Sequence, residues 1–534
     1  MAAEIFRSRY ADQPLNIARE CVARHAHSEL AKKTAMVFVA ADLSYREVSY
    51  AELEELTARF AASLRARGLT AGDRLLLRLP NTYAFPVAFF GALRAGMIPV
   101  PSSPMLTGPE VSYLLKDSGA RAMVTEASLL QSIRHECDLS ALAAMYVDGS
   151  TEPGELSFSA ELGAQSPEYE ISDTRGASPA YIVYTSGTTG YPKGVLHAQQ
   201  ALFGRLPAAT QWFPFSEPGF DRILHSGKFN WTYVLGTGMM DPLYHGKTVI
   251  VYEGENSAQR WIDLIGKFGC NIFIGVPTIF RQILQKTQAG SAQVPMLRHA
   301  MCAGEHLSDE VLSLWTQRFG FPVYEGLGMS ECSYYISQRR GEPAKPNSAG
   351  KIQQGHIVEL LDENLQPVPA GEEGMLCIRR DDPGLFIEYW NADEANAQQF
   401  SGNWFLTGDY AIIDADGYVF FMGRRDDIIK SFGYRVSPFE VERIYRDHPA
   451  IEDVAAFGEQ VENEKTLISL CVLMKAGQSF DETALLEWGA ARLASYKRPK
   501  KIHLLQKFPR SANGKVLRNQ LTRAIAENEN RKIS

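Results

Sequence analysis

The sequence predicts an α/β protein, with a large N-terminal domain of mostly parallel sheets and helices and a small α+β C-terminal domain. Helical patterns alternate with short apolar strand patterns through residues 1–170, an order typical of a parallel sheet covered by helices. At 534 residues the chain is too long for one hydrophobic core. An abrupt run of charged residues at 424–430 marks a boundary and gives the predicted domains 1–424 and 425–534.

The N-terminal elements follow from the spacing of apolar residues. Residues 49–67 place four apolar side chains on one helical face and end at Gly68, as expected of a capped amphipathic helix. The apolar runs that follow are short and bounded by polar residues, which is typical of alternating strands and helices. In order, they predict a strand over 75–79, a helix over 84–95, a strand over 97–100, a helix over 110–118 and a strand over 122–125.

The composition is that of an ordinary globular protein, with 45% hydrophobic and 22% charged residues. A net charge of −8 and a pI near 5.9 argue against a general nucleic-acid or anionic-membrane partner. No run of about eighteen apolar residues occurs, and residues 1–24 lack the apolar segment of a signal peptide. The seven cysteines are scattered without a CxxC pair, which indicates reduced thiols. We therefore expect a cytoplasmic enzyme, and the sequence leaves a homo-oligomer open.

A loop rich in hydroxyl residues and glycines follows a strand pattern at 180–184. Glycines let backbone N–H groups turn toward one point, and a lysine adds a positive charge, which together suit a chain of phosphates. The loop is not a Walker motif, because Lys193 is followed by Gly194 and not by Ser or Thr. The alternative is a flexible hydrophilic surface loop. The residues predicted to bind phosphate are Thr185, Ser186, Gly187, Thr188, Thr189, Gly190 and Lys193.

This order of hydroxyls, glycines, proline and lysine resembles the phosphate loop of the adenylate-forming superfamily. That superfamily includes the AMP-forming acyl-CoA synthetases, the firefly luciferases and the adenylation domains of peptide synthetases. The resemblance extends over essentially the whole chain, with five motifs in the same order. It implies ATP, Mg²⁺ and coenzyme A as co-substrates and cofactor, and a C-terminal domain that is mobile.

Three further strand patterns, at 271–278, 297–301 and 321–324, each run into a glycine-containing loop. The carboxyl ends of neighbouring strands form a crevice where nucleotides and substrates bind, although glycines at such ends are also ordinary turn residues. The presence of Glu305 and Glu331 beside them favours a site. The ATP-binding residues expected here are Gly304, Glu305, Glu325, Gly326, Leu327, Gly328, Met329 and Ser330.

The segment 326–331 resembles the Tyr-Gly-x-Thr-Glu motif of the superfamily. There the glutamate helps to hold Mg²⁺, which prefers hard oxygen ligands, so the resemblance makes Glu331 the predicted metal ligand and a catalytic residue. The sequence departs from the motif at Leu327, where the superfamily has an aromatic residue stacked on adenine. Part of that stacking energy should therefore be missing.

The segment 403–409 resembles the Thr-Gly-Asp signature, in which the aspartate accepts hydrogen bonds from both ribose hydroxyls. The resemblance therefore assigns Asp409 to the ribose, and Arg424 to the ribose or phosphate. The charged run that follows resembles the hinge of the superfamily, with Asp426 as the residue that absorbs the rotation. Without the resemblance, such a run would be a solvated turn. The segment Gly433, Tyr434 and Arg435 matches the part that meets coenzyme A.

The last hundred residues predict a separate small α/β unit. The pattern gives a helix over 439–446, strands over 454–457 and 467–474, a helix over 481–493 and a strand over 502–505. An irregular loop at 508–516 follows and carries Lys515 behind Asn513 and Gly514. A lysine on a terminal loop is ordinarily a surface charge. Its resemblance to the last motif of the superfamily makes Lys515 the predicted catalytic lysine, together with Lys193.

The acyl pocket is expected in the aromatic segment 228–233 and at the neighbouring strand ends. The alternative for this segment is a helix that packs Trp231 and Tyr233 into the core. Amino-acid-activating members of the superfamily carry an aspartate here, and this sequence has none, which favours an acid without an α-amino group. The predicted pocket residues are Phe229, Trp231, Gly275, Gly304 and Cys332.

The implied reaction joins a medium-chain or aromatic carboxylic acid to coenzyme A through an acyl-AMP intermediate, with release of pyrophosphate and then AMP. The segments Cys302–Glu305 and Asp382–Leu385 look most like short- and medium-chain or aryl acyl-CoA synthetases. One rival is an adenylating enzyme that loads a separate carrier-protein thiol. A second rival is a non-catalytic nucleotide-binding relative.

Overall fold

The computed structural model describes residues 8–185, 192–215, 220–304, 307–424, 427, 429–431, 434–461, 465–493, 495–510 and 516–533. The chain divides into two compact units. Unit 1 comprises Met1–Val358 and Ile378–Phe405, and unit 2 comprises Glu359–Cys377 and Leu406–Ser534. The α/β class is confirmed, with parallel sheets and helices in unit 1. The domain boundary at 424/425 stays a prediction.

Among the described residues the largest sheet has nine strands, in the order β16-β15-β14-β13-β12-β10-β11-β1-β2. Strands β1 and β10 to β14 run parallel, whereas β2, β15 and β16 are antiparallel to their neighbours. The nine strands are β1 (Thr34–Val39), β2 (Tyr45–Ser49), β10 (Arg222–His225), β11 (Thr248–Tyr252), β12 (Ile272–Gly275), β13 (His299–Ala303), β14 (Val323–Met329), β15 (Ser333–Ser337) and β16 (Lys351–Ile352).

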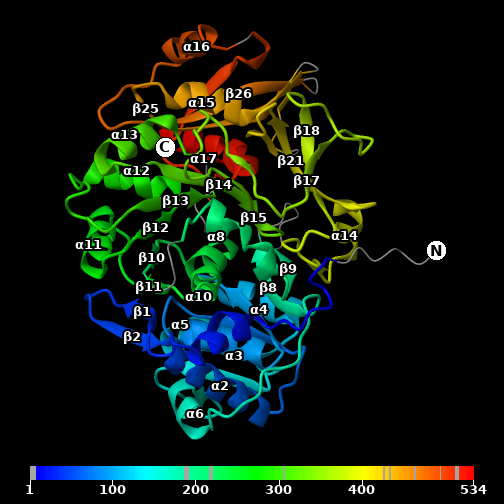
Figure 1. Cartoon of the computed structure of the whole chain (residues 1–534). Helices are drawn as coiled ribbons and strands as arrows, with labels where there is room; N and C mark the ends of the chain where they lie inside the picture. Colours follow the sequence, from blue (N-terminus) through cyan, green and yellow to red (C-terminus); the bar gives the residue numbers. More distant parts are fainter. Residues whose placement is uncertain are drawn as a thin grey trace. The chain divides into compact units, whose positions relative to one another are not determined.

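Three helices, α11 (Ala258–Phe268), α12 (Pro277–Lys286) and α13 (Asp309–Phe319), pack side by side on one face of this sheet (Figure 1). Their apolar faces and the strands share one core, in which Trp315 stacks on Phe319 at 3.9 Å between ring centroids. Each helix begins at a cap or a proline and two end at a left-handed glycine, so the sequence sets their lengths locally.

The second parallel sheet of unit 1 has the order β4-β3-β5-β6-β7. Helix α2 (Tyr50–Ala66) and helix α3 (Ala84–Arg94) pack together beside it, and a Cβ at Gly91 would lie 2.8 Å from the Phe60 ring. The close approach of the two helices therefore depends on glycine. The Ser49 hydroxyl caps the start of α2 by accepting from the Glu52 N–H. The strands are β3 (Arg74–Arg78), β4 (Ile98–Ser102), β5 (Ala120–Glu126), β6 (Ala144–Asp148) and β7 (Leu156–Ser157).

A small antiparallel sheet of unit 1 has the order β19-β9-β8. Its strands are β8 (Pro179–Thr185), β9 (Lys193–Ala198) and β19 (Glu388–Trp390). The other helices of unit 1 are η1 (Arg19–Ala23), α1 (Arg24–Ala26), α4 (Gly108–Ser118), α5 (Ala127–Ile133), α6 (Phe158–Ala164), α7 (Ala201–Gly204), α8 (Pro207–Gln211), α9 (Thr232–Leu235), η2 (Gly236–Met240), α10 (Asp241–Tyr244) and α14 (Asp393–Gln399). None of the helices that the structure describes meets the length and apolarity that a membrane span requires.

Unit 2 contains a three-stranded sheet in the order β25-β26-β27, with helix α15 beside it. Its elements are β22 (Val419–Arg424), β23 (Ile429–Ser431), β24 (Tyr434–Val436), α15 (Pro438–Arg446), β25 (Ile451–Val461), β26 (Lys465–Met474), α16 (Glu482–Ala490), η3 (Ser495–Lys497), β27 (Lys501–Leu504), η4 (Arg518–Gln520) and α17 (Leu521–Ile533). The chain passes between the units within β17 (Val358–Leu361), β18 (Glu373–Arg379) and β21 (Trp404–Ile413), and β20 (Phe400–Ser401) pairs with β21.

Two expected strand ends are wrong. The strand expected to stop at Tyr324 continues as β14 to Met329 and pairs with β15, so the glycine-rich segment there is strand and not loop. Neighbouring atoms occupy the space that side chains would need, since a Cβ at Gly328 would lie 1.8 Å from the Ser333 carbonyl oxygen. The strand pattern expected over 271–278 ends earlier, at Gly275, because Pro277 begins helix α12.

Candidate active site

The predicted phosphate loop connects β8 to β9, which pair antiparallel along their length. Thr185 and Lys193 are opposite each other at the end of this ladder, so both ends of the loop are held at one point. Ser186, Gly187, Thr188, Thr189 and Gly190 lie outside the described residues. Lys193 is therefore fixed by strand pairing at the base of the loop, with its ammonium 5.5 Å from the centre of the Tyr389 ring.

Tyr389 connects Lys193 to the predicted metal ligand. Its hydroxyl donates a hydrogen bond of 2.7 Å to Oε1 of Glu331, and the Phe386 N–H donates one of 2.7 Å to the Glu331 carbonyl oxygen. Glu331 is only 8% exposed. The carboxylate thus has a fixed orientation, beside a lysine at the end of the phosphate loop. A hard oxygen donor held in this way fits Mg²⁺ bound to phosphate.

A neutral histidine supports the same segment from β9. The Nε2 of His197 lies 2.8 Å from the Ser330 carbonyl oxygen, and its ring stacks on Tyr181 at 4.7 Å. Burial lowers the pKa of His197 to about 4, so the ring is uncharged near neutral pH. With Nε2 protonated, it donates to Ser330 and holds the residue before Glu331 against β9.

Removal of the Tyr389 hydroxyl should weaken this arrangement. We expect Tyr389→Phe to lower kcat/KM for acyl-adenylate formation about tenfold, since a hydrogen bond to a charged group contributes about 1.5–3 kcal/mol. Pyrophosphate exchange at several Mg²⁺ concentrations measures the effect. Tyr50→Phe is the matched control, because its buried hydroxyl donates to the Lys247 carbonyl oxygen away from Glu331. Equal losses in both variants would contradict the role of Tyr389.

The predicted adenine segment lies in β14, where Leu327 is opposite Ile336 of β15. Leu327 is half-buried, so an added ring has room on its exposed side. Gly326 faces the Trp212 indole, which a Cβ would approach to 2.4 Å, and the Trp212 N–H donates to the Tyr324 carbonyl oxygen. Because residue 326 is glycine, the Trp212 indole can pack directly against strand β14.

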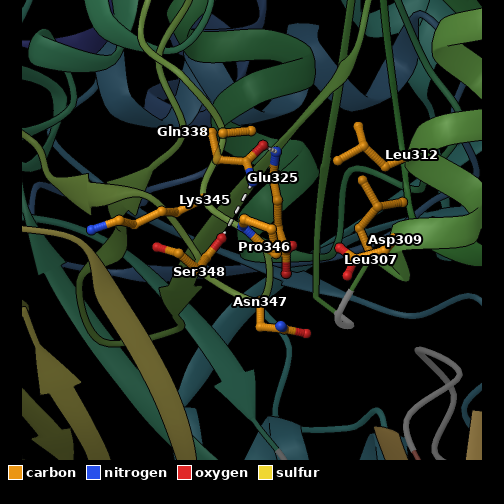
Figure 2. A pocket seen from close by; sticks show the side chains of 10 residues that line it. Leu307, Asp309, Leu312, Glu325, Gln338, Lys345, Pro346, Asn347 and Ser348 are labelled. Carbon is orange, nitrogen blue, oxygen red and sulfur yellow. Dashed lines mark hydrogen bonds between the residues drawn. The ribbon is translucent and has the colours of Figure 1, made fainter.

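A cavity of about 70 Å³ lies beside this strand (Figure 2). Gln338 fixes its wall, since it accepts from the Glu325 N–H at 3.1 Å and donates to the Ser348 carbonyl oxygen at 3.3 Å. The volume is about that of two water molecules in the liquid, so the hollow suits a small polar group next to Glu325. It is lined in part by Leu307, Asp309, Leu312, Glu325, Gln338 and Ser348.

An aromatic residue at 327 should strengthen ATP binding. We expect Leu327→Tyr to tighten the Kd of ATP about three- to tenfold, because aromatic pairs add about 0.5–1.5 kcal/mol beyond area burial. Calorimetric titration and the Tm of the same samples measure the outcome. Leu314→Tyr, at an exposed leucine of α13, controls for the addition of an aromatic ring. An unchanged Kd with a lowered Tm would show that the side chain packs inside the protein.

The predicted acyl pocket residues fall into two groups. Trp231 lies directly against Gly304, whose Cβ would be 2.9 Å from the indole, and Gly304 has a φ of 94° at the end of β13. Trp231 also meets Tyr233 edge to face at 5.1 Å between centroids. The Trp231 indole is half-buried, whereas Tyr233 is buried. Trp231, Gly304 and Gly275 at the end of β12 therefore lie at adjacent strand ends.

Phe229 and Cys332 are both buried and have other contacts. Phe229 is 2% exposed and packs on Phe85 at 5.2 Å within the core cluster. Cys332 is buried beside His356 and Asp382, and burial raises the pKa of its thiol well above the usual value. Asp382 accepts from the Ile357 and Gly384 N–H groups at 2.7 and 2.8 Å, so this cluster fixes the turn at 382–385. Roles for Phe229 and Cys332 in the pocket stay predictions.

A buried ion pair supports the chain that follows Glu331. Arg205 binds Asp241 with Nε–Oδ1 at 2.8 Å and Nη2–Oδ2 at 3.2 Å, and it also donates to Ser333 and to the Tyr334 hydroxyl. Both charged side chains are at most 7% exposed. Gly236 of the π-helix η2 lies against the guanidinium so closely that a Cβ would be 1.1 Å from Nη2. The pair thus ties the end of α7, the start of α10 and β15 together.

Unit 2 brings two predicted nucleotide ligands together. Asp409 of β21 is opposite Arg424 of β22, and Arg424 Nε lies 3.5 Å from Asp409 Oδ1. The Thr407 hydroxyl accepts from the Asp409 N–H at 3.0 Å and donates to the Leu376 carbonyl oxygen. Tyr434 and Arg435 lie in β24. Glu305, Asp426, Gly433 and Lys515 lie outside the described residues, so their roles stay predictions.

Two supporting residues were missed by sequence reasoning. Tyr389 and Arg205 act through partners that are 58 and 128 residues away in the chain, Glu331 and Ser333. No motif spacing predicts such contacts. The only signal in the sequence is the type of residue, since a buried arginine requires a carboxylate partner.

Comparison with known proteins defines the class. The sequence profile described as AMP-binding enzyme matches residues 22–390, and the profile of the AMP-binding enzyme C-terminal domain matches residues 440–515. A 3-hydroxybenzoate–CoA/4-hydroxybenzoate–CoA ligase of Thauera aromatica is 29% identical, over 95% of this chain and 97% of its own. The mitochondrial acyl-coenzyme A synthetase ACSM5 of Homo sapiens is 32% identical, over 85% of this chain and 80% of its own.

Solved structures agree with these matches. An anthranilate CoA ligase in complex with anthranoyl-AMP has a TM-score of 0.86 and 28% identity, covering 97% of this chain and 98% of its own. A benzoate CoA ligase from Burkholderia xenovorans has a TM-score of 0.84 and 29% identity, covering 95% and 99%. The fold and the matches are those of acid–thiol ligases. This chain belongs to the AMP-binding enzyme family, within the adenylate-forming superfamily, as an AMP-forming acyl-CoA synthetase.

Proposed function

We propose that this protein activates an aromatic or medium-chain carboxylic acid with ATP and transfers the acyl group to coenzyme A. The observation that carries the proposal is the position of Glu331, which Tyr389 holds beside Lys193 at the base of the phosphate loop. A fixed carboxylate next to a lysine and a glycine- and hydroxyl-rich loop suits Mg-ATP, because phosphate oxygens need both a cation and N–H donors.

In the first half-reaction the acid's carboxylate attacks the α-phosphorus, and pyrophosphate leaves. The chain's own residues hold the reactants in line and offset the charge that grows on the phosphate oxygens. We assign this task to Lys193 and Lys515, while Glu331 holds Mg²⁺ and Asp409 and Arg424 hold the ribose and phosphate. Bound Mg²⁺ would supply positive charge that offsets part of the charge on the phosphate oxygens.

In the second half-reaction the thiol of coenzyme A attacks the acyl carbon, and AMP leaves. We propose that rotation at Asp426 withdraws Lys515 and brings Gly433, Tyr434 and Arg435 toward the pantetheine arm. The two half-reactions would then use two arrangements of the C-terminal domain. This makes them separable by mutation.

The choice of acid rests on the side chains near Gly304. Trp231 lies against the Gly304 backbone and meets Tyr233 edge to face, so a planar acid would find aromatic surfaces at this point. Two acidic side chains lie ten residues from Trp231 in the sequence, and both are paired with cations: Asp241 with Arg205, and Asp221 with Lys247 and Arg298. The named ligases for benzoate, anthranilate and hydroxybenzoate support the same class.

The test is pyrophosphate exchange across a panel of acids, followed by the offer of coenzyme A. We expect the highest kcat/KM with benzoate-like acids or with six- to ten-carbon fatty acids, and formation of an acyl-CoA. An amino acid as the best substrate would overturn the assignment of the acid. Transfer to a phosphopantetheinylated carrier protein in preference to coenzyme A would favour the rival enzyme, and no exchange with any acid would favour a non-catalytic relative.

We further propose a cytoplasmic location without a nucleic-acid or membrane partner. The net charge of −8 disfavours anionic partners, and the seven cysteines, all of them described and buried, form no disulfide, which suits a reducing compartment. A homo-oligomer stays open, and size-exclusion chromatography with light scattering decides it.

A further inference from the structure

Unit 2 contains a buried carboxylate that gathers several donors. Glu442 of α15 is 0% exposed. Its Oε1 accepts from the Ala456 N–H at 2.9 Å and from Arg518 Nη2 at 2.5 Å, and its Oε2 accepts from Arg446 Nη2 at 2.9 Å. A buried charge requires such partners. Glu442 is therefore a fixed point to which two arginines from different segments are attached.

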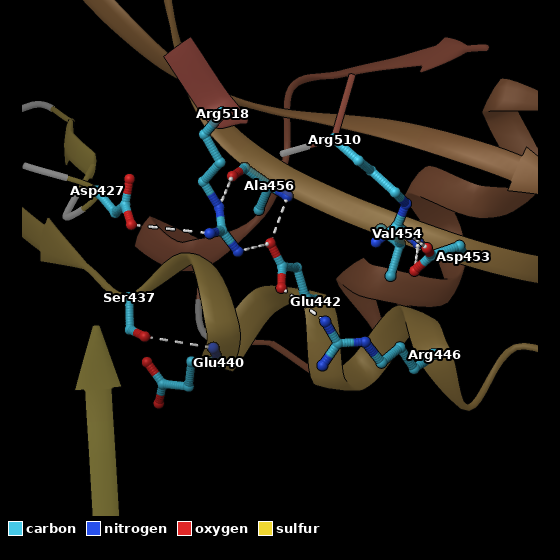
Figure 3. A network of polar contacts seen from close by, with 10 residues as sticks. All are labelled: Asp427, Ser437, Glu440, Glu442, Arg446, Asp453, Val454, Ala456, Arg510 and Arg518. Atoms are coloured by element: carbon cyan, nitrogen blue, oxygen red, sulfur yellow. Dashed lines mark hydrogen bonds and ion pairs between the residues drawn. The ribbon is translucent and has the colours of Figure 1, made fainter. Parts of the chain in front are cut away.

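The Arg518 side chain extends from this fixed point to other segments (Figure 3). Its Nε donates to the Ala456 carbonyl oxygen at 3.2 Å, and its Nη1 lies 3.7 Å from Asp427 Oδ2. The guanidinium also lies over the Phe439 ring at 4.5 Å. The planar fork of arginine makes several directed contacts at once, which lysine cannot do. Arg518 thus joins β25, α15 and the segment of Asp427.

Two residues of this network lie close in sequence to residues with a predicted role in the reaction. Arg518 follows Lys515 by three residues, and Asp427 follows Asp426 directly. The segment before Arg518 is also closed at its base, because Arg510 forms a β-bridge with Val516 and the Leu517 N–H donates to the Pro509 carbonyl oxygen at 2.9 Å. Arg510 is in turn ion-paired with Asp453 of β25.

We propose that Arg518 is a positioning residue that fixes the base of the lysine-bearing segment to the hinge segment, through Asp427 and on the support of Glu442. Residues 516–518, which follow Lys515, then move together with Asp427, which follows Asp426, so that the lysine returns to the same place for each adenylation. The proposal rests on the proposed function. It makes Arg518 matter for acyl-adenylate formation and not for thioester formation from pre-made acyl-AMP.

The chain offers a matched control in Arg446, which binds the other oxygen of the same carboxylate, Oε2, from within helix α15. Arg518→Lys and Arg446→Lys each remove one arginine fork from Glu442. We expect Arg518→Lys to slow adenylation about tenfold while thioester formation from acyl-AMP stays within about twofold, and Arg446→Lys to leave both within about twofold. Asp427→Asn should slow adenylation only about two- to fivefold, because a partly exposed ion pair with its atoms 3.7 Å apart contributes little.

Equal slowing of both half-reactions in Arg518→Lys, or equal effects in the two arginine variants, would overturn the proposal. Hydrogen exchange provides a measurement that does not depend on enzyme activity. The amide hydrogens of the peptide 508–520 should exchange faster in Arg518→Lys than in Arg446→Lys or the parent protein. If the parent protein forms no acyl-AMP from any acid, the proposed function fails, whereas the exchange comparison still decides the role of Arg518. Unchanged exchange in both variants would also overturn it.

Discussion

Replacement of Lys515 by alanine should lower the rate of acyl-adenylate formation about 10²–10³-fold, as loss of one donor to a transition-state anion does. Negative charge grows on the phosphate oxygens as the carboxylate attacks, and an ammonium group offsets it only while that charge is present. The same variant should convert pre-made acyl-AMP and coenzyme A to the thioester at nearly the parental rate. Pyrophosphate exchange and thioester release, measured on the same preparation, give the two rates.

Lys507 supplies the control for this prediction. It is an exposed lysine in the same domain, eight residues before Lys515, and its replacement by alanine should leave both half-reactions within about twofold. Equal losses of both half-reactions in Lys515→Ala would contradict the two-conformation mechanism. Loss of thioester formation alone would move the lysine from adenylation to transfer.

The motif residues were predicted because their chemistry is local in the sequence. Lys193 and Glu331 each belong to a run whose order of residue types has a meaning by itself, and the structure brings them together through Tyr389. Asp409 and Arg424 are likewise opposite each other in one hairpin. The helices with clear caps, such as 49–67, were also predicted to within a few residues, since capping is a local property.

The rest depended on contacts that no local pattern contains. A glycine-rich run after Tyr324 is typical of a loop, but β15 and Trp212 occupy the space around Gly326 and Gly328 and keep the run in a strand. Tertiary packing overrides local preference in such cases. The supports of the site, Tyr389 and the Arg205–Asp241 pair, are equally non-local. The sequence therefore predicted candidate groups for the chemistry, whose roles stay predictions, but not the residues that hold them in place.

Removal of Arg205 should cost about 3–5 kcal/mol in the free energy of unfolding, because it leaves the Asp241 carboxylate buried without its partner. The side chain of Arg205 is 2% exposed and binds Asp241 through two nitrogens. We expect Arg205→Ala to lower the Tm strongly and to weaken adenylation as well, since Arg205 also supports Ser333 two residues after Glu331. Arg523→Ala, in an exposed pair with Glu527, should change stability by less than about 0.5 kcal/mol.

The loss of stability in Arg205→Ala should also depend on pH. Burial raises the pKa of Asp241, and Arg205 opposes that rise. In Arg205→Ala the folded pKa should therefore lie further above the ordinary value of about 3.9. As the pH rises, the carboxyl group of Asp241 then loses its proton at a lower pH in the unfolded state than in the folded state. The free energy of unfolding therefore falls as the pH rises through the folded pKa. The deficit relative to the parent should be smaller at about pH 5 than at about pH 8.

A double variant distinguishes the effect of losing the ion pair on stability from the effect of losing packing contacts. Arg205→Met with Asp241→Leu removes both charges and keeps apolar volume, so it should be more stable than Arg205→Ala alone. Urea denaturation of the parent, the two single variants Arg205→Met and Asp241→Leu, and the double variant gives the coupling energy of the pair. Strictly additive losses at every pH would show that Arg205 and Asp241 act independently. A coupling energy that grows with pH is expected, because the penalty for the lone carboxylate appears only once it is charged.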